Sequence, residues 1–222
     1  MIKKRLKQII FFLVFVSISF FANAQPFAKE IAAFKKQDSL SFPGTGKILF
    51  VGSSSFTLWK DVQQYFPEYP IINRGFGGSS LTDLIRYAPD VIFPYDPRQI
   101  VIYCGENDFA GDTSLYPSQV AQRFFDLFNL IRARYKKVPI AYISMKPSPS
   151  RQHLMARFNV ANVMIKNFLK KKKRTAYIDV YKAMLKENGL PKDEIFLADK
   201  LHMNAEGYKI WKKIIEPYLL KD

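Results

Sequence analysis

The 222-residue sequence contains one cysteine and two histidines. A lone thiol cannot form an intramolecular disulfide, so the stability of the fold must come from the packing of its core. Cys104 lies within an apolar run, and we expect it to be buried as a small hydrophobic residue. With so few histidines and thiols, the sequence offers no ligand set typical of a zinc site, and no metal is expected.

Several catalytic and nucleotide-binding motifs are also missing. No Gly-x-Ser-x-Gly segment is present, which excludes the α/β-hydrolase pattern. The segment Gly44-Thr45-Gly46-Lys47 resembles the end of a P-loop, but Ile48 stands where serine or threonine is required. The segment Gly75-Phe76-Gly77 begins a dinucleotide fingerprint, yet the third glycine position is Ser80. We therefore expect no nucleotide cofactor.

Residues 1–24 have the composition of a signal peptide. Four basic residues precede an apolar stretch from Ile9 to Phe21, and Ala22-Asn23-Ala24 supplies the small-x-small pattern of a cleavage site. The apolar stretch is shorter than the roughly 20 residues of a spanning helix, and no cysteine follows the site for lipid attachment. We expect an exported, periplasmic or extracellular protein with one domain over residues 25–222 and no stable membrane insertion after cleavage.

Acidic residues are few, 19 against 34 lysines and arginines, and the formal net charge is +15. Loss of the four basic residues of the leader lowers it to +11. A charge of this size is typical of proteins that bind nucleic acid or anionic surfaces. However, the densest run, Lys170–Arg174, ends a predicted helix, where cations are favoured, and no aromatic residues interleave with it. We expect a solvated basic face, no nucleic-acid partner and a weak attraction to anionic envelope surfaces.

Short apolar runs bounded by turn residues alternate with segments of helical spacing. Runs of this kind are typical of buried parallel strands, and the spaced apolar residues between them indicate helices that pack on a sheet. The alternation predicts an α/β fold, a three-layer α/β/α sandwich with a five-stranded parallel sheet. The expected strands are Ile48–Val51, Pro70–Ile72, Ile100–Tyr103, Ile140–Ser144 and Ala176–Val180, and the expected helices lie near Phe27–Phe34, Val120–Tyr135, Leu154–Phe168 and after Asn204.

Polar, glycine-rich segments follow three of these strands: Gly52–Ser55, Asn73–Ser79 and Gly105–Asp108. Sites in open parallel sheets form beyond the carboxyl ends of the strands, so these segments should face one crevice. The first runs into a helical segment expected near Thr57 and can expose a serine hydroxyl. Near the C-terminus, Asp199-Lys200-Leu201-His202 places a carboxylate three residues before an imidazole, an arrangement suited to a general base. Alone, such a pair is more often a surface turn.

These four segments resemble, in order, the four blocks of the SGNH, or GDSL-like, hydrolase family, over residues 50–207. The resemblance implies the flavodoxin-like SGNH hydrolase fold and an ester-hydrolysing activity that needs no metal or organic cofactor. It implies a catalytic triad of Ser54, Asp199 and His202, and an oxyanion hole formed by the backbone amides of Ser54 and Gly78 and the side chain of Asn107.

Position 53 departs from the family pattern, because it is serine where the family usually has aspartate. That aspartate is not the catalytic acid, so the chemistry should survive. Ser53 and Ser55 are expected to point away from Ser54, since side chains alternate along an extended chain. Two alternatives stay open: Gly78 equally suits a tight turn, and Asn107 could cap the following helix, for which Asp108 is the more natural cap.

The expected function is that of an exported serine esterase acting on carboxylic esters. Connections between the elements are short, so the cleft should be shallow, and the best candidate substrate is a short O-acyl ester, acetyl above all, on a small molecule or glycan. Three alternatives remain: a lipase or lysophospholipase acting on lipid esters, a relative that binds glycans without turnover, and an interaction protein that acts through its charge.

Overall fold

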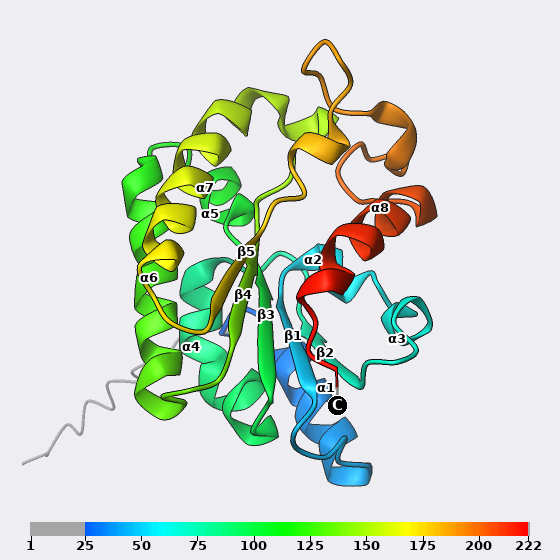
Figure 1. The fold of residues 1–222 in the computed structure, drawn as a ribbon. Helices are drawn as coiled ribbons and strands as arrows, with labels where there is room; N and C mark the ends of the chain where they lie inside the picture. The colour runs from blue at the N-terminus through cyan, green and yellow to red at the C-terminus, as the bar shows by residue number, and fades with distance from the viewer. Residues whose placement is uncertain (1–24, 222) are drawn as a thin grey trace, which may run out of the picture.

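A computed structural model describes residues 25–221 of the chain, so the predicted signal peptide lies outside the described residues. The sheet has five parallel strands in the order β2-β1-β3-β4-β5, which confirms the predicted flavodoxin-like α/β fold (Figure 1). The strands are β1 (Ile48–Gly52), β2 (Ile71–Gly75), β3 (Gln99–Tyr103), β4 (Ile140–Ile143) and β5 (Thr175–Ile178).

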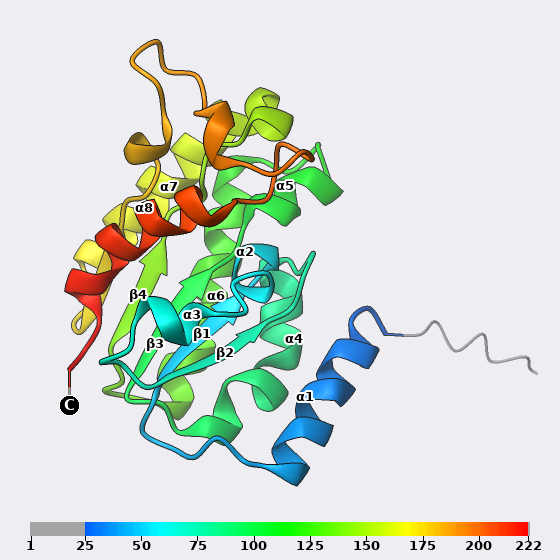
Figure 2. The same cartoon turned by 90° about the vertical axis from the view of Figure 1, so that its right-hand side faces the viewer.

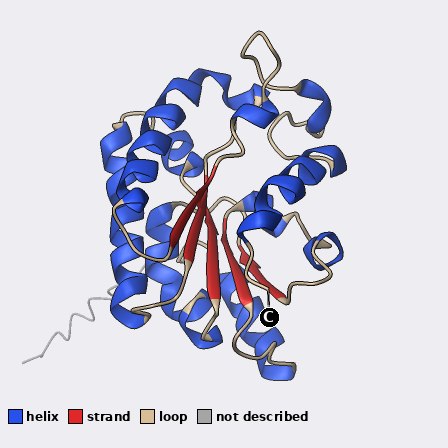
Figure 3. Cartoon of the chain, viewed as in Figure 1, coloured by secondary structure: helices blue, strands red, loops and turns tan. Residues whose placement is uncertain are grey.

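Helices cover both faces of the sheet (Figures 1 and 3). The three inner strands β1, β3 and β4 are buried throughout. Alternate residues of β1 therefore enter two separate cores, Leu49 and Val51 one of them and Ile48 and Phe50 the other. The first core is closed by α1 (Ala28–Leu40), α4 (Leu81–Val91), α6 (Pro117–Arg134) and α7 (Met155–Lys170), and the second by α2 (Ser54–Thr57), α3 (Val62–Tyr65) and α8 (Ala205–Ile215). A further short helix, α5 (Glu106–Gly111), follows β3.

Strand β2 and helix α4 differ from the sequence expectation. Strand β2 was expected to end at Ile72 but continues to Gly75, because pairing with β1 extends to the pair Gly52–Gly75 despite the polar residues between. Helix α4 was not predicted: it contains Pro89, and a proline normally interrupts a helix, although the apolar residues of this segment have helical spacing. A capping box between Ser80 and Asp83 starts this helix, and its buried face packs on the sheet.

The chain between β5 and α8 makes a long excursion at the carboxyl edge of the sheet, which Figure 2 shows at the top of the molecule. The expectation of uniformly short connections is therefore wrong for this segment. It returns through an antiparallel bridge between Phe196 and Met203, which closes the loop that carries Asp199 and His202. Among residues 25–221, no helix combines the length and apolar character that a membrane crossing requires.

Candidate active site

Ser54 is the first residue of α2, directly beyond the carboxyl end of β1. The turn before it lies close against β3: the amide of Ser53 donates to the carbonyl of Tyr103 at 3.0 Å, and a Cβ on Gly52 would come within 1.9 Å of the same oxygen. The carbonyl of Ser53 then accepts the amides of Phe56 and Thr57. The helical turn thus begins at Ser54, earlier than the expected start near Thr57, and it turns the Ser54 side chain into the crevice.

Ser54, His202 and Asp199 form one continuous chain of hydrogen bonds. The hydroxyl of Ser54 lies 3.0 Å from Nε2 of His202, and Nδ1 of the same ring lies 2.6 Å from Oδ2 of Asp199. A carboxylate can only accept, so Nδ1 carries the proton and Nε2 is left to accept from the serine hydroxyl. The structure therefore brings Ser54 together with Asp199 and His202, which lie nearly 150 positions further along the sequence.

Asp199 is held in its role by the backbone of its own turn. Its Oδ1 accepts the amides of His202 and Leu201, each at 2.9 Å. These two bonds to the ionised carboxylate, with a smaller contribution from the His202 ring, lower the pKa of Asp199 from 3.8 to about 2. Lys200, with φ +58°, makes the tight turn that allows this geometry. The Asp-x-x-His segment is thus an Asp-centred turn that also orients the imidazole.

The turn carrying His202 is attached to the serine turn through α8. The hydroxyl of Tyr208 donates to the carbonyl of Ser55 at 2.8 Å, and the Tyr208 ring stacks on Trp59 with the centroids 4.7 Å apart. Trp211, fully buried, packs edge-on against Phe56. These contacts dock one end of α8 on the segment that follows Ser54.

The predicted oxyanion residues Gly78 and Asn107 lie on segments that contact the serine turn. A Cβ on Gly77 would be 3.8 Å from the Cβ of Ser54, so the turn of residues 77–79 lies against the serine. Gly78 is exposed there with φ +86°, a conformation that glycine adopts at little cost. Nδ2 of Asn107 donates to Oγ of Ser53 at 2.6 Å and to the carbonyl of Ser79 at 3.0 Å. Asn107 thus bridges the two turns.

Two expectations about neighbouring residues are wrong. Ser53 does not point away from the site, because the extended chain ends at Gly52 and the Ser53 hydroxyl contacts Asn107. Asp108 does not cap its own helix, whose N-cap position is Gly105. Its carboxylate instead accepts the amide of Leu81 at 2.9 Å, at the start of α4, and a guanidinium N–H of Arg123 at 2.7 Å.

A cluster of charged side chains beside the site was not predicted from the sequence. The buried side chains of Glu106 and Lys146 and the guanidinium of Arg151 form an ion cluster, and Arg151 also contacts Asn107. Its place in the chain could have revealed this cluster. The segment 146–151 comes shortly after the carboxyl end of β4, where polar residues enter the same crevice as those after β1 and β3.

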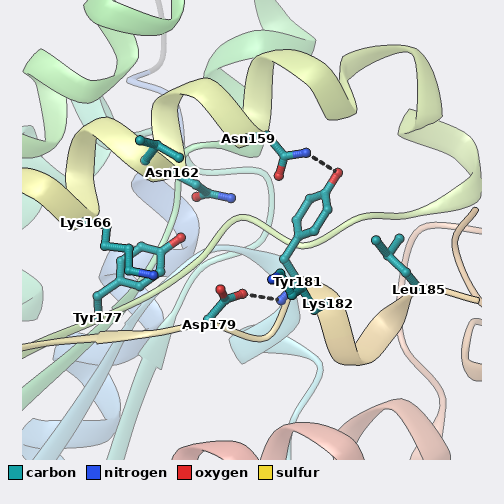
Figure 4. A pocket seen from close by; sticks show the side chains of 9 residues that line it. Asn159, Asn162, Lys166, Tyr177, Asp179, Tyr181, Lys182 and Leu185 are labelled. Atoms are coloured by element: carbon teal, nitrogen blue, oxygen red, sulfur yellow. Dashed lines mark hydrogen bonds between the residues drawn. The ribbon is translucent and has the colours of Figure 1, made fainter. Parts of the chain in front are cut away.

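A hollow of about 440 Å³ lies between α7, β5 and the turn after β5, and Figure 4 shows its side chains. The amide of Asn159 donates to the hydroxyl of Tyr181 at 3.1 Å, and Asp179 accepts the backbone amide of Tyr181 at 3.0 Å. Neither Ser54 nor His202 lines this hollow, so it is separate from the hydrogen-bonded chain.

Within the described part of the chain, no three His, Cys, Asp or Glu side chains are grouped to hold a metal ion.

The sequence model of the GDSL-like Lipase/Acylhydrolase family matches residues 38–210. No curated protein matches the chain. Among solved structures, it is similar to a candidate platelet activating factor from Streptococcus pneumonia (TM-score 0.75, 19% identity, 86% of this chain and 92% of that one). It is also similar to a GDSL-like lipase from Bacteroides thetaiotaomicron (TM-score 0.70, 20% identity, 85% of this chain and 96% of that one). A third similar structure is a mutant of an acetyl-xylooligosaccharide esterase from Geobacillus Stearmophilus (TM-score 0.61, 14% identity, 78% of this chain and 94% of that one). At these identities the likenesses show the fold alone.

Proposed function

The chain belongs to the GDSL-like lipase/acylhydrolase family and is an ester-hydrolysing enzyme, and we propose that it removes short O-acyl groups, acetyl above all, from carbohydrates. The proposal assigns Ser54 as nucleophile, His202 as general base and Asp199 as the acid that orients it. The observation that carries it is the chain of contacts Ser54–His202–Asp199, at 3.0 Å and 2.6 Å.

In the proposed acylation step, Oγ of Ser54 attacks the ester carbonyl while Nε2 of His202 accepts the hydroxyl proton. Asp199, ionised because its pKa is about 2, stabilises the imidazolium that forms. The imidazolium then gives its proton to the leaving alcohol. In the second step His202 takes a proton from the water that attacks the acyl-serine, and it returns this proton to Oγ of Ser54 as the acid is released.

The developing oxyanion would be held by the amides of Ser54 and Gly78 and by Nδ2 of Asn107. Both hydrogens of that Nδ2 now have acceptors, the Ser53 hydroxyl and the Ser79 carbonyl. The oxyanion would therefore take the place of the Ser53 hydroxyl, an exchange of a neutral acceptor for a charged one that is favourable only as charge develops. Loss of one such donor typically lowers kcat by about 10²–10³.

The exposure of these groups supports a small acyl group on a bulky alcohol. The Asp199 side chain is 47% exposed and that of His202 is 23% exposed, and Gly78 lies at the surface. A triad at the surface admits a polymeric alcohol from outside, whereas a long acyl chain needs a deep apolar channel to remove it from water. The likeness to a fold that also serves an acetyl-xylooligosaccharide esterase is consistent with this choice.

The catalytic assignment is tested with p-nitrophenyl acetate and the Ser54→Ala variant. We expect turnover by the wild type and a loss of at least about 10⁴-fold in the variant. Ser55→Ala is the matched control, because it removes an adjacent hydroxyl and leaves both the nucleophile and the Ser53–Asn107 contact in place. Turnover that survives in Ser54→Ala would exclude it as nucleophile, and a wild type inactive on every ester would favour a glycan-binding role.

The substrate class is tested by two measurements. A series of p-nitrophenyl esters from acetyl to palmitoyl should show kcat/KM falling beyond four carbons, and acetylated oligosaccharides should release acetate. A preference for the longest chains would instead indicate a lipase or lysophospholipase.

Export and a weak attraction to anionic envelope surfaces are part of the same proposal. The N-terminus of the mature protein should be Gln25, as read by mass spectrometry of protein from the periplasm or medium. The exposed cations of residues 170–174 should give binding to anionic vesicles that disappears at about 0.5 M salt. An unprocessed N-terminus would exclude the predicted cleavage.

A further inference from the structure

The Asn107 side chain is held at both ends. Its Nδ2 faces Ser53 and Ser79, and its Oδ1 accepts a 2.7 Å hydrogen bond from Nη2 of Arg151. We propose that Arg151 is a positioning residue that fixes the orientation of the Asn107 amide, and so keeps an N–H donor aimed at the oxyanion site. This inference rests on the proposed function, because it concerns the same reaction.

The orientation of an asparagine amide needs such a determinant, since a half-turn exchanges its oxygen and nitrogen with little change in shape. The Ser53 hydroxyl can donate or accept, so it fits either orientation. The Ser79 carbonyl accepts only, and it favours the observed one. Arg151 donates only, and its charge makes the bond to Oδ1 stronger than one between neutral groups. In the turned amide, an N–H would face the guanidinium and the oxygen would face a carbonyl.

Arg151 is itself held by a buried carboxylate. Its Nη1 donates to Oε2 of Glu106 at 3.2 Å, and its side chain is 15% exposed. Glu106 also accepts from the hydroxyl of Tyr103 and from both the amide and the ammonium of Lys146. Lys146 is almost fully buried, so Glu106 balances the charge of two cations and cannot move away from them without a large desolvation cost. The guanidinium is therefore anchored before it reaches Asn107.

The loop that carries Arg151 is also joined to the catalytic turn. The amide of Ser150 donates to the carbonyl of Lys200 at 3.0 Å, and the amide of Arg151 donates to the carbonyl of Ser148 at 3.1 Å. Lys200 lies between Asp199 and His202. One loop thus contacts both the presumed oxyanion donor and the turn that holds the general base, which makes the position of Arg151 relative to Ser54 well defined.

The test is the kinetics of Arg151→Met on p-nitrophenyl acetate, with Arg151→Lys as the conservative variant. An amide that is free to turn or shift by about 1 Å should cost about 10- to 100-fold in kcat, with KM changed less than about threefold, because ground-state binding does not use the oxyanion bond. Arg151→Lys retains a cationic donor and should recover at least part of kcat. A rise in KM at constant kcat would overturn the proposal, since it would show that Arg151 binds substrate directly.

A double-mutant cycle with Asn107→Ala separates action through Asn107 from independent action. If Arg151 works through the amide, Arg151→Met should lower kcat little or not at all once Asn107 is alanine. Multiplicative losses would overturn the proposal. Arg123→Gln is the matched control: it removes an arginine from the neighbouring carboxylate of Asp108 without touching Asn107, and folded protein of this variant should keep wild-type kcat.

Failure of this inference is distinguishable from failure of the proposed function. An inactive wild type, or an active Ser54→Ala variant, would refute the proposed function. An active wild type with multiplicative losses would refute only the role of Arg151. Thermal unfolding of each variant reports folding, and comparing kcat at equal concentrations of folded protein removes any general loss of stability.

Discussion

The hydroxyl of Tyr208 donates a 2.8 Å hydrogen bond to the backbone carbonyl of Ser55, across 153 positions of sequence. Ser55 directly follows Ser54, and Tyr208 lies in the first turns of α8, shortly after His202. This bond therefore joins the element that carries the serine to the element that carries the imidazole. The 3.0 Å separation of Ser54 and His202 depends on how α8 is docked, and Tyr208 is a main point of that docking.

Tyr208→Phe removes this bond and leaves a buried carbonyl without its partner. We expect a loss of about 1–3 kcal/mol in the free energy of unfolding and a fall of several-fold in kcat as the Ser54–His202 contact loosens. Denaturant unfolding and p-nitrophenyl acetate turnover measure the two effects. Tyr218→Phe is the control: Tyr218 is 41% exposed, so its loss should change stability by no more than about 0.5 kcal/mol. Equal effects of the two substitutions would contradict the docking role.

His202→Ala should abolish ester turnover, by at least about 10⁴-fold, because among residues 25–221 no other side chain is hydrogen-bonded to the Ser54 hydroxyl and could accept its proton. The fold should persist, since the His202 ring is partly exposed. His153→Ala provides a close control, as it removes the other histidine, which is exposed, and should keep full activity. An active, folded His202→Ala variant would return the Asp-x-x-His segment to the role of a simple turn.

Asp199→Asn should lower kcat by about 10³–10⁴, because an amide can present a donor to the ring and favour the wrong tautomer. With a pKa of about 2, Asp199 stays ionised throughout an assay from pH 4 to 9. The acid limb of log kcat/KM against pH should therefore have a slope of one proton. A slope of two would show that the carboxylate titrates together with the base.

The same lowered pKa predicts a pH dependence of stability. Folding lowers the pKa of the Asp199 carboxyl group from 3.8 to about 2. Its contribution to the free energy of unfolding is therefore complete above pH 3.8 and is lost as the pH falls through about 2. Unfolding of the wild type and Asp199→Asn should therefore converge toward pH 2. Because Asp199 is exposed, the difference is expected to be small. A gap that widens on acidification would contradict the assignment.

Gly52→Ala tests the close approach of β1 and β3 beneath the serine turn. A Cβ there would lie 1.9 Å from the carbonyl oxygen of Tyr103, so the strands must separate, at a cost of about 2 kcal/mol or more. Gly111→Ala is the contrasting case: it lies at the end of α5 with open space around its Cβ and should be neutral or stabilising by up to about 1 kcal/mol. Urea denaturation compares the two variants.

The five strands were predictable because each contains a short apolar run, which in β1, β3 and β4 is buried throughout, and such a run depends on residue type alone. Helix α4 was not, because it contains Pro89, a residue that normally interrupts a helix. Capping by Ser80 and Asp83 and the packing of its buried face stabilise the helix in spite of the proline. The extent of β2 was also missed, because Asn73 and Arg74 join the sheet through pairing with β1 rather than through their own propensity.

The site residues were identified from their segments, but their contacts were not. Ser53 was expected to point away, on the assumption that the strand continued past Gly52, whereas the start of α2 turns it toward Asn107. The cluster around Glu106 went unseen because its charges come from two strand ends far apart in sequence. Charged residues near strand ends are normally solvated, so only the tertiary structure shows that these are buried beside the site.

By itself, the sequence determined which residue types could carry the chemistry and the edge of the sheet at which they lie. The strands are parallel, so the polar segments that follow them come together at one edge. It could not determine distances between them. The contact of Ser54 with His202, the direction of the Asn107 amide and the anchoring of Arg151 are long-range relations. Each depends on how helices and loops pack in the folded chain. That packing is decided by the shapes and contacts of side chains that are far apart in the sequence.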